Sequence, residues 1–283
     1  MLVASPAAML RCLYVDLDGT LLGPDASLVS GADGRFSLLG VRALEACARA
    51  GAEVVIYSGR RQSSVWEAAR LIGSRSFIFE LGCGLVLDGE LEWLTDGLEP
   101  SQTAGSIFEQ IEASGAVSLL LDRFAGSLEP HAPWSAVRDV SHLFRGSVSL
   151  DEVSSVLAEA GLERFRLLDN GVIPEAHALG LMPELDVVRA YHLVPAGASK
   201  GRAVARHMQN RGYASSECIA CGDSREDLSA AGVVGTFWLV ANALQRDPGL
   251  AAETGGRPDV RVCAEAYGAG VYEAVVTTLS EGR

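Results

Sequence analysis

Short apolar runs that stop at polar loops, separated by helical stretches, constrain the fold more than any other feature of the sequence. The run over residues 10–15 is apolar and stops abruptly at Asp16, as a buried parallel strand does where it meets a loop. A helical pattern over residues 37–50 and a second apolar run over residues 53–57 follow it. This order of strand, helix and strand predicts a parallel sheet with helices on its faces.

The same rhythm marks both ends of the chain but not its middle. At the ends we predict helices over 62–72, 199–210, 226–231 and 268–279, and strands over 76–79, 217–220, 236–240 and 259–262. In the middle, strand-like runs at 85–87, 117–121 and 165–168 alternate with helical patterns at 103–113 and 150–160. The expected fold class is α/β: a Rossmann-like, three-layer core with a parallel sheet, made of residues 1–83 and 192–283. An inserted α+β domain would occupy residues 84–191.

The charge of the chain limits its partners. It has 23 Lys and Arg against 36 Asp and Glu, a formal net charge of -13, and such a surface repels nucleic acid and anionic lipid. We therefore expect no nucleic-acid or membrane partner, and any anionic substrate would need a metal ion or converging basic groups. The first residues lack the basic start of a signal peptide, and no apolar run near them is long enough to span a bilayer, so we expect a cytoplasmic location. The oligomeric state stays open.

The six cysteines lie in apolar segments rather than in a dense framework, which predicts reduced, buried thiols. Cys218 and Cys221 have the spacing of a metal or redox pair, but no second pair accompanies them. Residues three apart in a strand also point to opposite faces. We interpret both cysteines as core residues.

Polar and charged side chains collect where the predicted strands of the core end. They are Asp16, Asp18, Ser58, Arg60, Asp223 and Asp227, with Lys200 at the start of a predicted helix. Loops at the carboxyl ends of parallel strands converge on one crevice. Several carboxylates beside one lysine need a counter-ion, and carboxylate oxygens are ligands that Mg²⁺ accepts. Taken singly, these residues could be helix caps or turn formers; taken together they favour catalysis.

The order of these motifs is informative. Along the chain stand Asp16-Leu17-Asp18-Gly19-Thr20, Ser58-Gly59-Arg60, Lys200, and Gly222-Asp223-Ser224-Arg225-Glu226-Asp227. The set resembles the motifs of the haloacid dehalogenase superfamily of phosphatases. The Gly-Ala-Ser-Lys-Gly segment and the large insertion look like the branch that includes mannosyl-3-phosphoglycerate phosphatase, sucrose-phosphatase and the Cof-type enzymes, whose α+β cap follows the third strand. A calcium loop of the EF-hand type does not fit, because its further oxygen ligands, central Gly and closing Glu are missing.

The resemblance implies catalytic roles. Asp16 would attack phosphorus to form an aspartyl-phosphate, and Asp18 would protonate the leaving oxygen and then activate water. Ser58 would donate a hydrogen bond to a phosphoryl oxygen, and Lys200 would do so with a full positive charge.

The resemblance also implies a Mg²⁺ site and substrate contacts. Asp16, the backbone carbonyl of Asp18, and Asp223 would hold the ion, while Asp227 would orient Lys200 or bind the ion through water. The candidate substrate contacts are Ser58, Gly59, Arg60, Lys200 and Asn242 in the core, and His131, His177 and Arg189 in the insertion.

Two residues depart from the pattern of the superfamily. Glu226 and Leu81 stand where its members more often have Asn. The departures bear on the surroundings of the metal and on the hinge of the cap, and they leave the nucleophile and the metal ligands in place.

The function that follows is a Mg²⁺-dependent phosphomonoesterase for a small phosphorylated sugar or sugar acid, with mannosyl-3-phosphoglycerate as one candidate. Two alternatives remain at this point. One is a sugar phosphomutase, which shares the chemistry, and the other is a non-catalytic protein that binds a phosphorylated ligand.

Overall fold

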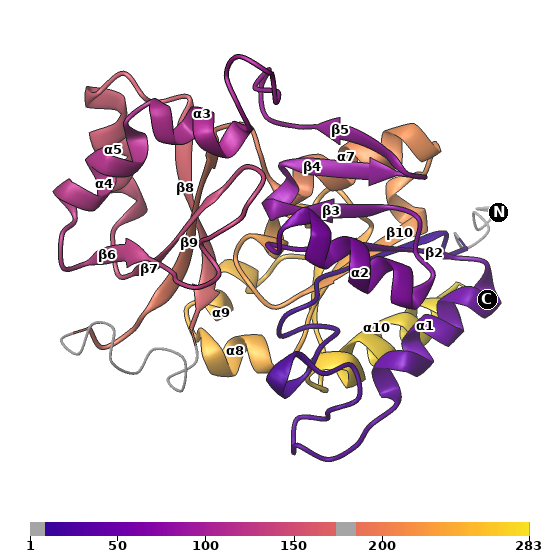
Figure 1. Cartoon of the computed structure of the whole chain (residues 1–283). Coiled ribbons are helices and arrows are strands. Elements are labelled where there is room, and N and C mark those ends of the chain that lie inside the picture. Colours follow the sequence, from indigo (N-terminus) through magenta and orange to yellow (C-terminus); the bar gives the residue numbers. More distant parts are fainter. Residues whose placement is uncertain (1–8, 174–184, 283) are drawn as a thin grey trace.

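The computed structural model describes residues 9–173 and 185–282, and its strands form two sheets. The larger sheet has eight strands in the order β12-β11-β10-β1-β2-β3-β4-β5 (Figure 1). Their bounds are β1 (Cys12–Val15), β2 (Glu53–Tyr57), β3 (Phe77–Phe79), β4 (Gly84–Leu87), β5 (Glu90–Trp93), β10 (Cys218–Gly222), β11 (Thr236–Leu239) and β12 (Val260–Val262). Pairing is parallel from β12 to β3 and antiparallel from β3 to β5.

Helices cover both faces of the larger sheet, as the alternation along β1 requires. Leu13 and Val15 pack in one core with α1 (Leu39–Ala50), α2 (Gln62–Ile72) and α10 (Tyr267–Glu281). Cys12 and Tyr14 face the other core with α7 (Lys200–Arg211), α8 (Asn242–Arg246) and α9 (Leu250–Thr254). Successive strand residues point to opposite faces, so a strand that is apolar throughout must be covered on both sides. The predicted three-layer α/β fold is confirmed.

The smaller sheet is antiparallel, in the order β6-β7-β9-β8, and lies beside the carboxyl-end edge of the larger one (Figure 1). Its strands are β6 (Leu128–Pro130), β7 (His142–Gly146), β8 (Phe165–Val172) and β9 (Arg189–Pro195). Three helices, α3 (Ile107–Ala113), α4 (Ala116–Arg123) and α5 (Leu150–Glu159), pack on it through a separate apolar core. Short 3-10 helices lie between the strands and α-helices: η1 (Pro24–Ala26), η2 (Glu80–Gly82), η3 (Ser215–Glu217) and η4 (Asp227–Ala230).

One local prediction was wrong, and a second was right only in part. Residues 117–121, predicted as a strand, form part of α4, in which the buried Ala116 and Leu120 are four residues apart and so lie on one helical face. A short apolar run fits a strand or a buried helix equally well by its pattern alone. The predicted helix at 226–231 is the 3-10 turn η4, because Asp227 accepts bonds from the backbone of the preceding loop.

The predicted ends of the insertion, residues 84 and 191, both fall within paired strands. The hairpin of β4 and β5 continues the larger sheet from β3, and β9 runs in the smaller sheet as far as Pro195. Hydrogen bonds between strands far apart in sequence decide this division. In the described part of the chain, no helix is long and apolar enough to cross a membrane.

Candidate active site

A cavity of about 1150 Å³ lies between the two sheets. One wall comes from the loops after β1, β2 and β10, with Asp16, Asp18, Ser58, Arg60 and Asp223. The opposite wall comes from the insertion, with His131, Arg138, Asn170 and His192 among its residues. The strand ends therefore converge as predicted, and the insertion supplies a second wall.

Lys200 lies at the centre of the polar cluster behind this wall. Its side chain is 1% exposed, and its Nζ donates to Asp16 Oδ1 at 2.8 Å and to Asp227 Oδ1 at 2.6 Å. Burial disfavours the charged amine, but Asp16 and Asp227 outweigh burial and raise the pKa of Lys200 above its ordinary value. Lys200 is also the single lysine of the chain. A compact ammonium is thus kept where two buried carboxylates meet.

The carboxylates of the cluster carry more negative charge than Lys200 neutralises. Burial, opposed by Lys200 but reinforced by Asp227 and Asp223, raises the pKa of Asp16 well above its ordinary value. Burial, opposed by Arg246, likewise raises the pKa of Asp223 to about 6. Ligand oxygens of Asp16, Asp223 and Asp227 lie within 4.8 Å of one another. An oxygen-only donor set with surplus negative charge fits Mg²⁺, which would favour the ionised carboxylates.

Asp227 organises the loop that carries Asp223. Its Oδ2 accepts from the backbone N–H groups of Asp223 and Ser224, at 3.0 and 2.9 Å, and from the Ser224 hydroxyl at 2.7 Å. Its other oxygen binds Lys200. A Cβ at Gly222 would lie 2.3 Å from Asp227 Cβ, so this close approach needs glycine. These contacts suit a residue that positions the lysine and the loop.

The loop after β1 approaches Asp223 equally closely. Gly19 has a φ of +88°, and a Cβ there would lie 2.3 Å from Asp223 Oδ2. Thr20 donates its hydroxyl to Asp223 Oδ1 at 3.2 Å, and Arg246 donates to Oδ2 at 2.6 Å. Asp223 is thereby held against the β1 loop, next to Asp16.

Asp18 faces the cavity and pairs with Arg60. Arg60 Nε donates to Asp18 Oδ2 at 2.6 Å and Nη2 donates to Asp18 Oδ1 at 2.5 Å, so the pair is bidentate. The hydrogen bond to Asp18, against an opposing effect of burial, raises the pKa of Arg60. The Asp18 side chain is 52% exposed, whereas Asp16 is buried. The two aspartates of the motif therefore have different surroundings.

Of the remaining predicted core residues, Ser58 and Gly59 line the cavity, whereas Asn242 does not. Ser58 is buried and lines the cavity, and its Oγ accepts from Arg60 N at 3.2 Å. Gly59 lies against the insertion, since a Cβ there would be 2.9 Å from Asn170 Nδ2. Asn242 lies behind the described lining of the cavity: its amide donates to Gly19 O at 2.8 Å and its oxygen accepts from Tyr267 N at 2.9 Å. It ties the β1 loop to the start of α10.

The residues that depart from the superfamily pattern have structural partners. Glu226 accepts from Lys200 N at 3.0 Å, at the start of α7, and burial raises its pKa to about 7. Leu81, with a φ of 58°, packs in the core of the smaller sheet. Glu226 thus holds the start of α7, and Leu81 connects the larger sheet to the apolar core of the smaller one.

Of the substrate contacts predicted in the insertion, His131 lies at the cavity and Arg189 does not. His131 lines the cavity, whereas Arg189 pairs with Asp169 and Asp247, each at 2.7 Å. His177 lies outside the described residues. Arg138 and Arg246 were not predicted from the sequence. They line the cavity from a loop and a short helix, and no strand-end pattern marks them.

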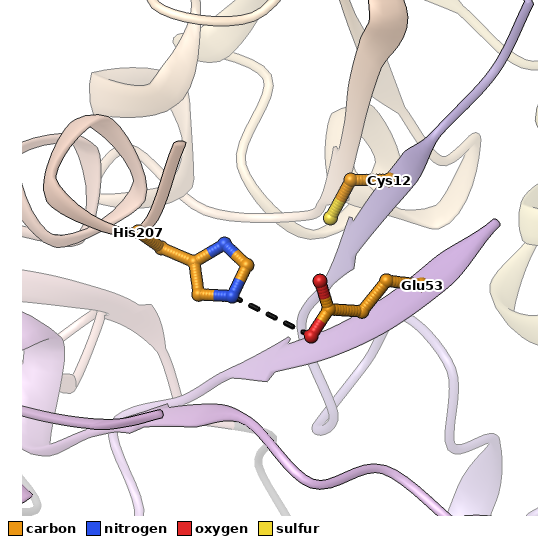
Figure 2. A group of neighbouring side chains, drawn as sticks. All are labelled: Cys12, Glu53 and His207. Atoms are coloured by element: carbon orange, nitrogen blue, oxygen red, sulfur yellow. Dashed lines mark ion pairs between the residues drawn. The ribbon is translucent and has the colours of Figure 1, made fainter. Parts of the chain in front are cut away.

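A second group of possible ligands lies at the amino ends of the strands. Cys12, Glu53 and His207 have ligand atoms within 4.8 Å of one another, and Figure 2 shows them on β1, β2 and α7. His207 Nε2 is 3.6 Å from Glu53 Oε1, and His207 Nδ1 is 2.8 Å from the Tyr14 hydroxyl. Glu53 also accepts bonds from Ser76, Arg211 and Tyr213. The carboxylate is already saturated and paired with a cation, which favours a structural network over a metal site.

Comparison with known proteins gives consistent relatives, although no protein-family model matches the chain. A phosphoglycolate phosphatase from Methanoculleus marisnigri is 27% identical over 270 residues, 94% of this chain and 96% of that protein. Another, from Methanococcoides burtonii, is 24% identical over 276 residues, covering 97% and 99%. Two further phosphoglycolate phosphatases, from Halorubrum lacusprofundi and Pyrobaculum neutrophilum, match at 28% and 27% identity.

Solved structures share the fold. The sucrose-phosphatase of Synechocystis, solved with sucrose and phosphate, superposes with a TM-score of 0.65 at 16% identity, covering 96% of this chain and 98% of that one. A phosphatase of the haloalkanoate (HAD) superfamily from Bacteroides thetaiotaomicron also has a TM-score of 0.65, at 18% identity and 98% coverage of both chains. With its motif residues gathered at the strand ends, this chain has the fold of phosphatases of the haloacid dehalogenase superfamily, and it is similar over nearly its whole length to phosphoglycolate phosphatases.

Proposed function

We propose that the chain is a Mg²⁺-dependent phosphomonoesterase that acts on a small phosphorylated acid through an aspartyl-phosphate on Asp16. The observation that carries the proposal is the position of Asp16, which is buried at the end of β1, bound to Lys200 and beside Asp223, on the wall of the cavity. Phosphoglycolate is the first candidate substrate, because four relatives carry that name. Phosphorylated sugars and sugar acids, including mannosyl-3-phosphoglycerate, are the second group.

The attack depends on holding an anionic nucleophile next to an anionic phosphate. Lys200 binds Asp16 Oδ1 at 2.8 Å, which orients the carboxylate and offsets part of its charge. Ser58, buried on the wall of the cavity, would donate its hydroxyl to a phosphoryl oxygen. Attack by Asp16 forms the new O–P bond as the ester O–P bond breaks, and water then cleaves the acyl phosphate.

Asp16, Asp223 and the backbone carbonyl of Asp18 would hold Mg²⁺, with Asp227 positioning Lys200 and the Asp223 loop. When bound, the ion would supply positive charge against the phosphoryl oxygens. Removal of the metal with a chelator should therefore abolish turnover, and added Mg²⁺ should restore it.

Asp18 would be the acid and base. Arg60 holds it in the cavity through two hydrogen bonds. A phosphate dianion competes with Asp18 for this guanidinium group, so substrate binding would release the Asp18 carboxylate. The released carboxylate would take up a proton from solvent, give it to the leaving oxygen and later take a proton from the attacking water.

The insertion would act as the cap over this site. Its residues form the second wall of the cavity, and we propose that it extends from the end of β5 to Pro195, following the strand pairing. The leaving group would then contact the cap, whereas the phosphate would contact the core.

The test is phosphate release from a panel of phosphoglycolate, sugar phosphates and phosphorylated glycerates with Mg²⁺. Asp16→Asn should lower kcat by about a thousandfold or more, while Asp33→Asn, in an exposed loop, should leave it unchanged. Equal release by the wild type and Asp16→Asn would refute the nucleophile. A phosphomutase would instead keep phosphate on isomeric products and need a bisphosphate activator, and a binding protein would bind the ligands without turnover.

A further inference from the structure

We infer that Arg138, assisted by Arg61, forms a subsite for a carboxylate of the substrate, at the junction of the core and the insertion. The inference rests on the proposed function and assigns the part of the cavity that would distinguish a phosphorylated acid from a neutral phosphate ester. Both residues line the cavity.

Arg138 is a buried cation held in place from one side. Its side chain is 4% exposed, its Nε donates to Ser141 Oγ at 3.0 Å, and one terminal nitrogen donates to Gly59 O at 2.7 Å. Its Nε is 3.6 Å from Glu80 Oε2, but both carboxylate oxygens of Glu80 accept hydrogen bonds from other donors. These donors are the backbone N–H groups of Asp139, Val140 and Ser141 and the Ser141 hydroxyl. Arg138 therefore has no bidentate carboxylate partner among the described residues.

Other arginines that face the cavity are already matched. Arg60 pairs with Asp18, Arg246 pairs with Asp223, and Arg225 pairs with Asp247. Arg61, in contrast, has no carboxylate within ion-pair distance in the described part of the chain, and its Nε donates to Ser64 Oγ at 3.3 Å. Among the described residues, Arg61 thus has no carboxylate partner and Arg138 has only the 3.6 Å contact with Glu80, in a chain whose net charge is -13.

The two arginines bridge the same junction from opposite sides. Arg138 reaches from the insertion to the carbonyl of Gly59, and Arg61 reaches from the core to the carbonyl of Val137 at 3.5 Å. Gly59 directly follows Ser58, the proposed phosphate contact. In a phosphorylated two-carbon hydroxy acid the carboxylate is only two bonds beyond the ester oxygen, so it must bind close to the phosphate. A guanidinium group anchored on Gly59 is placed for this, and its fork matches a carboxylate.

His192 completes the surroundings of this subsite. It is buried in the same wall, with Nδ1 3.0 Å from Ser141 Oγ. Burial, followed by the charges of Arg138 and Lys200, lowers the pKa of His192 well below its ordinary value. The imidazole is therefore neutral beside Arg138, and adds hydrogen-bonding capacity to the subsite without a second charge.

The test compares ligands that differ only in the carboxylate. For turnover, phosphoglycolate is compared with 2-hydroxyethyl phosphate; for binding, phosphonoacetate is compared with ethylphosphonate by calorimetry in the presence of Mg²⁺. The wild type should favour the carboxylated member of each pair. Arg138→Gln should reduce that preference by about 10- to 100-fold, Arg61→Gln should reduce it by less, and Arg138→Lys should restore part of it.

Arg123→Gln, at an exposed position of α4, is the matched control and should change neither the turnover preference nor the binding preference. The subsite is refuted if wild-type binding does not distinguish phosphonoacetate from ethylphosphonate, or if Arg138→Gln and Arg61→Gln keep the wild-type preference. An equal loss for both members of a pair would also refute it, because that result indicates a general structural defect. Discrimination in binding without any phosphate release would instead contradict the proposed phosphatase reaction and leave the subsite supported.

Discussion

At the scale of single residues, the ionic state of the site depends on Lys200. The ammonium group lies between Asp16 and Asp227 and 4.9 Å from the centre of the Tyr57 ring. Burying two carboxylates is tolerable only while a cation remains between them. Lysine is compact enough for this enclosed position, whereas arginine, used at every other basic position of the chain, has a larger, planar head group.

Lys200→Met should therefore destabilise the metal-free protein by about 3–5 kcal/mol at pH 7, because two buried carboxylates lose their partner. Urea unfolding in the presence of a chelator measures the loss. Mg²⁺ should recover more stability in the variant than in the wild type, since the ion replaces part of the missing charge. A variant as stable as the wild type without metal would show that Asp16 and Asp227 do not need this counter-charge.

At the scale of secondary-structure elements, Glu53 joins β2 to α7. Its carboxylate lies near His207 of the helix (Figure 2). It also accepts hydrogen bonds from Arg211, at the end of the helix, and from Tyr213, just beyond it. Burial disfavours the charged carboxylate, but the contacts with His207 and Arg211 outweigh burial and hold the pKa of Glu53 below its ordinary value. The start of α7 carries Lys200, so this anchor at the far end of the helix helps to fix the site.

Glu53→Gln should lower the free energy of unfolding by about 2 kcal/mol at pH 7. A depressed pKa in the folded state stabilises the protein above the ordinary pKa of glutamate, and this stabilisation is lost as the pH falls from about 4.3 towards the folded-state pKa. The difference between the wild type and the variant should therefore shrink below about pH 4.3. Urea unfolding as a function of pH checks this, with Glu45→Gln, in an exposed pair on α1, as the control. A constant difference across this range would contradict the assignment.

At the scale of the whole molecule, Glu80 links the two sheets. It follows β3 of the larger sheet, and its fully buried carboxylate accepts hydrogen bonds from the backbone N–H groups of residues 139–141, which directly precede β7 of the smaller one. The same contacts hold Arg138 at the cavity. Glu80 is thus a buried acceptor that, together with the Arg138–Gly59 and Arg189–Asp247 contacts, fixes the position of the insertion on the core.

Glu80→Gln should destabilise this junction by about 2–3 kcal/mol, because an amide offers one acceptor oxygen and cannot satisfy the same donors. Hydrogen exchange should accelerate at residues 139–141 before it accelerates in β1 or β10. The exposed Glu159→Gln on α5 is the control. Unchanged exchange at residues 139–141 would show that Glu80 does not hold the insertion.

Local pattern predicted much of this architecture. Residues 53–57 and 62–72 formed the expected strand and helix, because the first run is rich in β-branched residues and the second has the amphipathic stripe of a helix. Residues 117–121 did not, since a five-residue apolar run has no period of its own. The hairpin at 84–93 could not be assigned to a sheet locally, because either sheet could accept its edge.

The sequence by itself determined which groups stand at the ends of the core strands. Asp16, Ser58 and Asp223 each follow an apolar run directly, and parallel strands carry such residues to one edge of a sheet. Which charged side chains pair with one another depends on the tertiary structure. The pairing of Arg60 with Asp18, the withdrawal of Asn242 behind the β1 loop, and the position of Arg138 at Gly59 depend on contacts between segments far apart in the chain. Periodicity records burial along one element, and it contains no information about the partner that a side chain meets across a cavity.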